Sequence, residues 1–474
     1  MKPNIVLITV DCWRGDHIGK AHDAKVATPN IDKLADQSYY FANAHSCGGW
    51  TKIAMTTLFS STYASMYGFT KGKLSDDRPL LAEELASHGY HTAGFTTNIV
   101  CGSPQGFNRG FQTFEDIKPE NTANEFKINK VRGFHRLSKF PLFHSILSLM
   151  GIDSSPTYPS LPADELVNRA LHWLDHEHDK ERPYFLWLHF MDLHMPYRSS
   201  LRAKTGEVIS TMWRDRSLWS LIKKSRGTYR SSEEQSQQWK QLYAEETGFL
   251  DQHLGRLSSQ LQSRPDWQNT ALCLTADHGE EFYEHGTWGH SWNQLYDEGI
   301  RVPLLLRLPN QATGNTIDEA ISHLDITPTL LDIAGVARSD KMLGKSWLPA
   351  LKTEPGVSRA HESSIPIVSE MHGHMGSYQF RLSITYEKHK YIYDGDTDSC
   401  LLFDLETDPD THNNLYSKNH PLAPMFDQLR LAHIAKGALA ALKGNVHLGG
   451  DAISYDLDDD PAVLDRLRAL GYLE

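Results

Sequence analysis

The chain has 474 residues, of which 40% are apolar and 22% charged, so it can build a sizeable core and is not intrinsically disordered. Its net charge of −12 argues against a nucleic-acid binder, which would normally carry a basic surplus. Five widely spread cysteines exclude a disulfide scaffold, whereas 25 histidines are consistent with a protein that holds a metal.

The chain begins MKPNIVLITVDC, in which Asp11 ends a short apolar run. That run is too short for the apolar part of a signal peptide. No later stretch approaches the ~20 apolar residues of a membrane span. We therefore expect a cytoplasmic protein with no membrane span.

Short β-branched runs then alternate with amphipathic segments. NIVLITV shows no polar–apolar alternation, which is typical of a strand buried on both faces of a parallel sheet. The expected strands are 4–10, 92–97, 184–190, 271–276 and 302–308, and the expected helices are 28–41, 78–89, 164–177 and 241–262. This alternation predicts a doubly wound α/β domain over residues 1–360.

Two insertions and a change of pattern complete the predicted organisation. Residues 120–165 and 198–240 interrupt the α/β rhythm, and we expect them to cover the mouth of the site. They carry Phe134, Arg136, Trp213 and Trp219. Within residues 361–474, short strands at 365–371, 380–394 and 399–406 and a helix at 421–443 predict a smaller antiparallel sheet followed by a tail.

Two of the expected strands end in residues that bind metals. Asp11 follows the first strand, and Asp277 and His278 follow the strand at 271–276. Because ligands bind at the carboxyl ends of strands in open α/β sheets, these three side chains predict a divalent-cation site. The alternative is that both aspartates are helix caps.

The stretch CGGWTKIAMTTLFSS (47–61) predicts a helix that starts at Thr51. A hydroxyl at a helix N-terminus lies beside backbone N–H groups, where a tetrahedral oxyanion binds well. The alternative is that Thr51 is an ordinary N-cap.

Beyond these residues, the chain resembles the sulfatase family of the alkaline phosphatase superfamily along nearly its whole length. The matching stretches are NIVLITVDCWRGDHIG, TPNIDKLADQSYYFANAHS, LTADHGE, EHGTWGHSWNQLYDEGIRVPLLLR, HLDITPTLLDIAG, KYIYD…LFDLETDPDTHNNL and the terminal LRALGYL. The resemblance implies an alkaline-phosphatase-like α/β sheet with a smaller C-terminal sheet, and one divalent metal ion (Mn, Zn or Ca).

Position by position, the resemblance implies that Asp11, Asp277, His278 and Thr51 hold the metal and that Thr51 is also the nucleophile. His194 and His290 match positions that contact the ester or its leaving group. Lys52 is expected to face the developing charge.

Several positions depart from the family pattern. Sulfatases carry a Cys or Ser within C-x-P-S-R that becomes formylglycine, whereas this chain has Thr51-Lys52-Ile53-Ala54-Met55. Cys47 lacks the following Pro and Arg and is not taken as a substitute. Thr97-Asn98-Ile99 replaces Lys-x-His, which removes two cations; we expect Thr97 and Asn98 to bind substrate. His290 stands where Lys often follows Trp-Gly, and Cys12 replaces the second Asp.

These departures favour phosphoryl over sulfuryl transfer. Formylglycine eliminates sulfate through a second hydroxyl that Thr lacks, so water must attack the esterified centre, a plausible step for phospho-threonine. We expect a hydrolase of the phosphodiester or phosphonate monoester type. The alternatives are a sulfatase that uses unmodified Thr51 and a non-catalytic metal-binding relic.

Other site residues keep open alternatives. Cys12 is either a soft zinc ligand or a small neutral filler. Asp192 with His194 offers a second metal site, although a single metal is expected. The alternative to a catalytic role for His290 is a purely structural one. His189 and His285 are interpreted as residues that support the site ligands or as structural residues. Glu280, Asp325 and Arg301 are interpreted as loop, cap and ion-pair residues. The expected substrate is a small-molecule, saccharide or lipid-headgroup ester, and homo-oligomer formation stays open.

Overall fold

The computed structural model describes residues 2–67, 69–70, 73–117, 162–195, 197, 232–290, 295–352, 365–372 and 380–443. Its largest element is an eight-stranded sheet with the order β14-β2-β13-β9-β1-β8-β6-β7. The strands are β1 (Asn4–Val10), β2 (Tyr39–Phe41), β6 (His91–Thr96), β7 (Thr113–Asp116), β8 (Tyr184–Phe190), β9 (Thr270–Ala276), β13 (Leu304–Arg307) and β14 (Asn315–Ile317).

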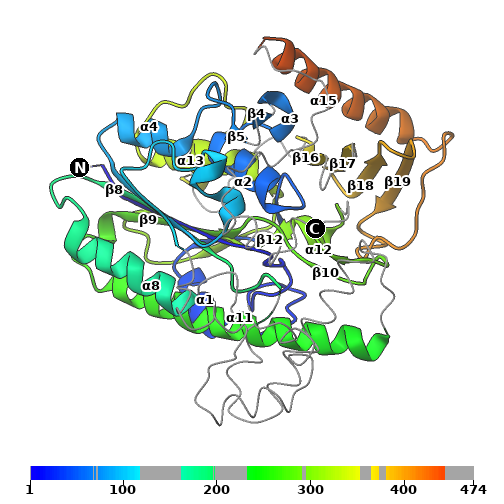
Figure 1. Cartoon of the computed structure of the whole chain (residues 1–474). Helices are drawn as coiled ribbons and strands as arrows, with labels where there is room; N and C mark the ends of the chain where they lie inside the picture. Colours follow the sequence, from blue (N-terminus) through cyan, green and yellow to red (C-terminus); the bar gives the residue numbers. More distant parts are fainter. Residues whose placement is uncertain are drawn as a thin grey trace, which may run out of the picture.

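Helices cover both faces of this sheet (Figure 1). One set consists of α1 (Pro29–Ala35), α8 (Ala163–His172) and α11 (Glu233–Gln262). The other consists of α2 (Thr51–Ser60), α4 (Leu81–Ser87) and α13 (Ile326–Ile333). Every residue of β1, β8 and β9 is buried, which explains their uninterrupted apolar sequences. The expected α/β fold is therefore confirmed.

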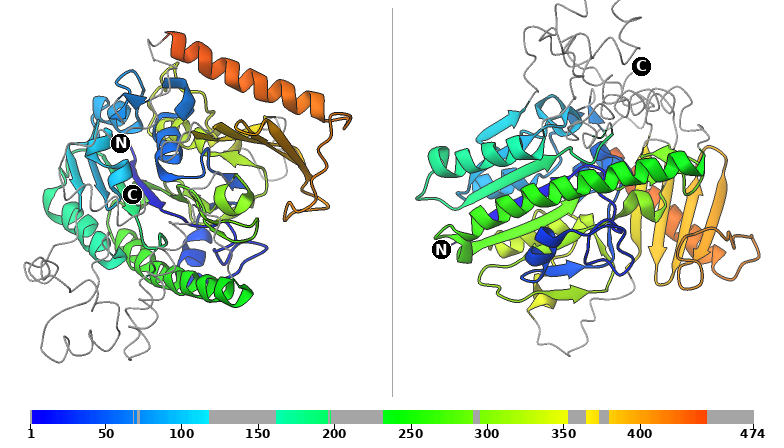
Figure 2. Two further views of the ribbon diagram at one scale, coloured as in Figure 1. Left: turned by 45° about the vertical axis from the view of Figure 1, so that its right-hand side comes forward. Right: turned by 90° about the horizontal axis from the view of Figure 1, so that it is seen from below.

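A smaller antiparallel sheet lies to one side of the large one (Figure 2). It contains β16 (Ile367–His372), β17 (Phe380–Tyr386), β18 (His389–Asp394) and β19 (Ser399–Asp404), and α15 (Ala423–Lys443) packs against it. Its apolar side chains form a cluster that also includes Cys47, Tyr63 and Met66. The small sheet therefore packs directly on the segments that flank α2.

Short elements complete the described chain. The strands are β3 (Ala44–His45), β4 (Phe69–Thr70), β5 (Lys73–Leu74), β10 (Glu281–Phe282), β11 (Trp288–Gly289), β12 (Arg301–Val302) and β15 (Ile321–Ser322). The helical turns are α3 (Ala64–Tyr67), η1 (Ile99–Cys101), η2 (Ser103–Gln105), η3 (Trp173–Glu177), η4 (Trp267–Asn269), α12 (Asp297–Ile300), η5 (His323–Asp325) and α14 (Leu348–Leu351). None of the helices in the described ranges is long and apolar enough to cross a membrane.

Some expected elements differ from the structure. The predicted helix 28–41 stops at Ala35, and Tyr39–Phe41 is a strand because it pairs with β13 and β14. β13, expected at 302–308, runs antiparallel to β9, so the sheet is mixed. α11 starts at Glu233 with a capping box between Ser232 and Gln235, so the end of the second insertion is helical. The first insertion, up to residue 161, and residues 198–231 lie outside the described residues.

Candidate active site

The carboxyl ends of β1 and β9 lie side by side because the two strands pair in parallel, with Val10 opposite Ala276. The backbone N–H of Asp277 donates to the carbonyl oxygen of Val10 at 3.1 Å. Asp11 and Asp277 therefore leave the sheet at the same edge, and both are fully buried. The sheet brings together the two carboxylates that the sequence predicted as metal ligands.

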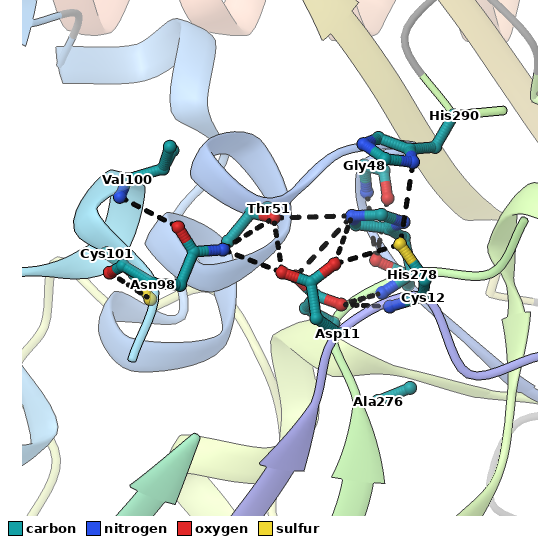
Figure 3. Close-up of polar contacts among 12 residues, drawn as sticks. Asp11, Cys12, Gly48, Thr51, Asn98, Val100, Cys101, Ala276, His278 and His290 are labelled. Carbon is teal, nitrogen blue, oxygen red and sulfur yellow. Dashed lines mark hydrogen bonds and ion pairs between the residues drawn. The ribbon is translucent and has the colours of Figure 1, made fainter. Parts of the chain in front are cut away.

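Thr51, the first residue of α2, reaches the same edge (Figure 3). Its Oγ1 donates to Oδ2 of Asp11 at 3.3 Å and lies 3.3 Å from Nε2 of His278. That nitrogen is 3.7 Å from Oδ1 of Asp11 and 3.5 Å from Oδ2 of Asp277. Four side chains with metal-ligating atoms thus converge on one buried position.

The interpretation of Thr51 as an ordinary N-cap is wrong. Trp50, in an extended conformation with φ −156° and ψ 157°, occupies the N-cap position of α2, and its side chain makes no capping hydrogen bond. The Thr51 hydroxyl turns toward Asp11 and His278 instead. Since this hydroxyl does not serve the helix, its placement points to chemistry at the sheet edge.

The interpretation of the two aspartates as helix caps is wrong as well. Oδ1 of Asp277 accepts from the backbone N–H groups of Cys12 at 3.2 Å and His278 at 2.7 Å. These bonds join the loops after β1 and β9, and no helix begins directly after either aspartate in the described residues around them. Asp277 therefore locks the two loops together.

Electrostatics at this edge favours a bound cation. Burial would raise the pKa of Asp11, but His189, His194 and His278 hold it well below its usual value. Burial and the neighbouring charge of Asp11 raise the pKa of Asp277 well above its usual value. A second buried carboxylate beside an ionised one is costly until a cation lies between them.

The donor set fits a divalent metal. Oδ2 of Asp277 is buried and has no hydrogen-bond partner within the described part of the chain. Burial lowers the pKa of His278 to about 3, so its ring is neutral, as metal ligation requires. Its Nδ1 faces the carbonyl oxygen of Gly279 at 2.8 Å, which leaves Nε2 directed at the two aspartates. Two carboxylates, a hydroxyl and one imidazole would suit a hard or borderline ion.

Asn98 lies beside Thr51 in the site (Figure 3). Its Nδ2 donates to Oδ2 of Asp11 at 2.6 Å and to Oγ1 of Thr51 at 3.4 Å, while its Oδ1 accepts from the backbone N–H of Val100 at 2.8 Å. Thr97 is buried beside it. Substrate binding by Thr97 and Asn98 stays a prediction; the contacts of Asn98 are with the metal-ligand and nucleophile candidates.

Two histidines and a carboxylate line the opposite side of Asp11. The rings of His194 and His290 lie 5.1 Å apart, and both are nearly fully buried. Nδ1 of His290 is 3.2 Å from Oε1 of Glu280, and the His290 ring is 4.6 Å from that of His278. Burial lowers the pKa of His290 to about 4 and raises that of Glu280 to about 7. This pairing orients His290 and argues against a purely structural histidine.

Other predicted residues lie in different surroundings. Oδ1 of Asp192 accepts from the backbone N–H of Ala163 at 2.9 Å, so this carboxylate oxygen secures the start of α8. Lys52 is fully buried in α2, where burial lowers its pKa to about 7. The Cys47 thiol contacts the Ser322 hydroxyl at 3.0 Å, outside the group around Thr51 and Asp11, in agreement with the prediction that Cys47 does not replace Thr51.

Three of the residues interpreted as structural or as loop, cap or ion-pair residues contact groups other than the metal-ligand candidates. Arg301 pairs with Asp23, and His285 stacks on Tyr296 with ring centroids 3.6 Å apart. Asp325 accepts from the backbone N–H of Lys345, and no side chain caps the helix that follows it. These three therefore have no part in the site described above.

Sequence reasoning interpreted Glu280 as a loop residue and His189 as either a support for the ligands or a structural residue, and both lie at the site. Nδ1 of His189 contacts Oγ1 of Thr9 at 2.8 Å, and its Nε2 is 3.6 Å from Oδ2 of Asp11. Both residues lie on the predicted metal edge, since His189 is on β8, next to β1, and Glu280 is two residues after His278. Burial of a charged or polar residue at a strand end was the available signal.

Comparisons with known proteins agree with this fold. Residues 3–336 match the Sulfatase family, and residues 283–433 match the family described as N-sulphoglucosamine sulphohydrolase, C-terminal. A choline-sulfatase of Rhizobium meliloti is 25% identical over 462 residues, covering 91% of this chain and 87% of that protein.

Solved structures share the fold. A phosphonate monoester hydrolase of Agrobacterium radiobacter superposes with a TM-score of 0.65 at 19% identity, covering 93% of this chain and 96% of that one. A structure in complex with its substrate D-glucosamine-2-N,6-O-disulfate gives a TM-score of 0.66 at 18% identity, covering 96% of this chain and 99% of that chain.

The fold and the family match define a hydrolase with an alkaline-phosphatase-like architecture. More narrowly, the chain belongs to the sulfatase family, whose members hydrolyse sulfate or phosphonate esters and typically bind a divalent metal. The resemblance seen in the sequence is therefore confirmed.

Proposed function

We propose that this protein is a metal-dependent hydrolase that cleaves phosphate esters of the phosphodiester or phosphonate monoester type, with Thr51 as its nucleophile. The observation that carries the proposal is the position of the Thr51 hydroxyl. It lies 3.3 Å from both Asp11 and His278 and does not cap its own helix. Asp11, Asp277, His278 and Thr51 are the proposed ligands of one divalent ion.

When bound there, the ion would polarise a non-bridging oxygen of the ester and make the Thr51 hydroxyl more acidic. Asp11 and Asn98 hold the hydroxyl in place through contacts of 3.3 and 3.4 Å. In the first step, the Thr51 hydroxyl releases its proton to solvent, and its Oγ1 forms a bond to phosphorus as the bond to the leaving oxygen breaks. The backbone N–H and side chain of Lys52, the next residue of α2, are proposed to face the charge that develops on the transferred group.

His290 or His194 donates a proton to the leaving alcohol in that step. Glu280 faces Nδ1 of His290, which leaves Nε2 as the nitrogen for proton transfer. In the second step, the same imidazole takes a proton from water, the water oxygen bonds to phosphorus, and the bond to Oγ1 of Thr51 breaks. Oγ1 of Thr51 regains from solvent the proton that it lost in the first step, so the products are the monoester and the free Thr51 hydroxyl.

The preference for a phosphate ester follows from the Thr51 nucleophile and from the lack of cationic side chains at positions 97 and 99. A threonine sulfate has no second hydroxyl through which to eliminate sulfate, whereas metal-assisted water attack can resolve phospho-threonine. A sulfate monoester also presents three non-bridging oxygens against two in a phosphodiester. Thr97 and Ile99 supply no positive charge for an additional oxygen.

The test is a panel of bis(p-nitrophenyl) phosphate, p-nitrophenyl phosphate and p-nitrophenyl sulfate, with and without Mn²⁺ or Zn²⁺. We expect the highest kcat/KM for the diester in the Mn²⁺-loaded protein, and no activity after chelation. Faster hydrolysis of the sulfate ester would overturn the phosphoryl assignment. The natural substrate is expected to be a small-molecule, saccharide or lipid-headgroup ester.

A sulfuric ester hydrolase that uses unmodified Thr51 is the second candidate. It is supported by the family match over residues 3–336 and by the choline-sulfatase relative, which aligns along 91% of this chain. The same panel separates it from the first, because only the sulfatase would prefer p-nitrophenyl sulfate.

A further inference from the structure

Cys12 lies in the centre of a second group of metal-binding side chains. It follows Asp11 in a left-handed backbone conformation, with φ 61°, and its carbonyl oxygen accepts from the Tyr243 hydroxyl at 2.6 Å. This conformation turns Sγ back toward the site, where it lies 2.9 Å from Oδ1 of Asp11 and 3.5 Å from Nδ1 of His290. The thiol is fully buried.

The ligand atoms around this thiol are close enough to share an ion. Those of Asp11, Cys12 and His194 all lie within 4.8 Å of one another, and those of Cys12, His278 and His290 do as well. His278 directs Nε2 to Asp277 and Thr51, so it belongs with the first ion. The remaining donors meet at Sγ of Cys12: Asp11 and His194 form one close group with it, and Nδ1 of His290 lies 3.5 Å from it.

Their spacing suits zinc. Zn–S of about 2.3 Å and Zn–N of about 2.0–2.1 Å at a tetrahedral angle place sulfur and nitrogen about 3.5 Å apart. The distance from Sγ of Cys12 to Nδ1 of His290 is 3.5 Å. Thiolate and imidazole ligands select a thiophilic ion over calcium or magnesium.

The two groups meet at Asp11. Its Oδ2 contacts Thr51 and Asn98, whereas its Oδ1 lies 2.9 Å from Sγ of Cys12 and 3.7 Å from Nε2 of His278. A carboxylate can bridge two ions, so both groups can each hold an ion at the same time.

We propose that Cys12, His290, His194 and Oδ1 of Asp11 form a second site, selective for a thiophilic divalent cation such as Zn²⁺. Binding replaces the thiol proton, which is released to solvent, and occupies Nδ1 of His290 in place of its contact with Glu280. A bound His290 cannot gain a proton. Zinc at this site therefore inhibits turnover, a consequence that rests on the proposed acid–base role of His290, whereas the site itself does not.

Cobalt is the probe, because thiolate ligation to Co²⁺ gives an intense near-ultraviolet charge-transfer band. Full-length protein is treated with chelator, loaded with one equivalent of Mn²⁺ and titrated with Co²⁺. We expect the band in the wild type and in Cys273→Ala, which removes a buried thiol from β9, and no band in Cys12→Ser. Absence of the band in the wild type, or an equal band in Cys12→Ser, would overturn the site.

A second variant keeps the thiol in place. In His290→Gln, the Co²⁺ concentration that gives half of the maximal band intensity should rise about tenfold or more. Even the loss of a residue that only hydrogen-bonds to a metal ligand weakens metal binding by that factor. An unchanged titration would exclude His290 as a ligand. Circular dichroism checks the fold of each variant.

The activity arm uses Mn²⁺-loaded protein and the diester substrate. Added Zn²⁺ should lower the rate of the wild type and leave the ratio of rates with and without zinc near one in Cys12→Ser. Zinc raising the wild-type rate above the Mn²⁺ rate would refute the inhibition. The cobalt band should persist in Thr51→Ala, so failure of the thiolate site and failure of the proposed nucleophile are distinguishable.

Discussion

Replacement of Thr51 by Ala separates chemistry from helix stability. The hydroxyl makes contacts of 3.3 Å to Asp11, 3.3 Å to His278 and 3.4 Å to Asn98, all at the long end of the hydrogen-bond range. Their loss should cost less than about 1 kcal/mol of unfolding free energy. Because no side chain caps α2, no capping contribution is lost.

The effect on turnover should be far larger. Removal of a nucleophile costs about 10⁴-fold or more in kcat, and the residual rate comes from the remaining site. Thr51→Ser, which keeps a hydroxyl, should recover part of that rate. Thr51→Cys should not create a sulfatase, because Ile53 and Met55 occupy the Pro and Arg positions of the modification motif.

The assay is steady-state hydrolysis of bis(p-nitrophenyl) phosphate, with urea denaturation measured on the same preparations. The matched control is Thr57→Ala, which removes a buried hydroxyl that donates to the carbonyl oxygen of Ile53 at 3.2 Å in the same helix. The control should lose stability comparably and keep its rate. Thr51→Ala retaining more than about a tenth of the wild-type kcat would refute the reasoning.

Three further predictions follow from individual contacts. Asp277→Asn should lower metal content, measured by elemental analysis; equal content in both proteins would contradict the ligand assignment. Asn98→Ala removes the 2.6 Å bond to Asp11 and should weaken Mn²⁺ binding about 10–100-fold in a titration, with an unchanged affinity counting against that contact. Burial opposes ionisation of Glu370, but His372 and His433 hold its pKa well below the usual value, so its stabilisation is complete above about pH 4.3 and is lost as the pH falls further. Glu370→Gln should therefore cost more stability at about pH 5 than at about pH 3, and a pH-independent difference in urea unfolding would refute this.

The strands and the metal edge were largely predictable because buried strands carry their signal locally. NIVLITV and YFLWLHF were expected at 4–10 and 184–190, and the structure has β1 and β8 at those bounds. Parallel pairing then fixes where Asp11 and Asp277 emerge. The residues that follow strand ends could thus be placed before any coordinates were known.

Elements that depend on partners were not predictable. Tyr39–Phe41 continues an amphipathic pattern but becomes a strand through its pairing with β13, and the antiparallel direction of β13 has no signature in its own sequence. Glu280 likewise reads as a loop residue; its importance comes from full burial against His290, which lies ten positions later.

The attachment of the small sheet has a consequence for how this protein can be recombined. Glu370 of β16 donates its backbone N–H to the carbonyl oxygen of Cys47 at 2.9 Å, and the Ser369 hydroxyl donates to that of Ser46 at 2.6 Å. These bonds hold the segment that leads into Thr51. Backbone acceptors are supplied by any residue, whereas the side chains of Cys47, Tyr63 and Met66 pack in the small-sheet cluster. A chimaera that exchanges the C-terminal region with that of a relative should therefore inherit these three residues from the same parent.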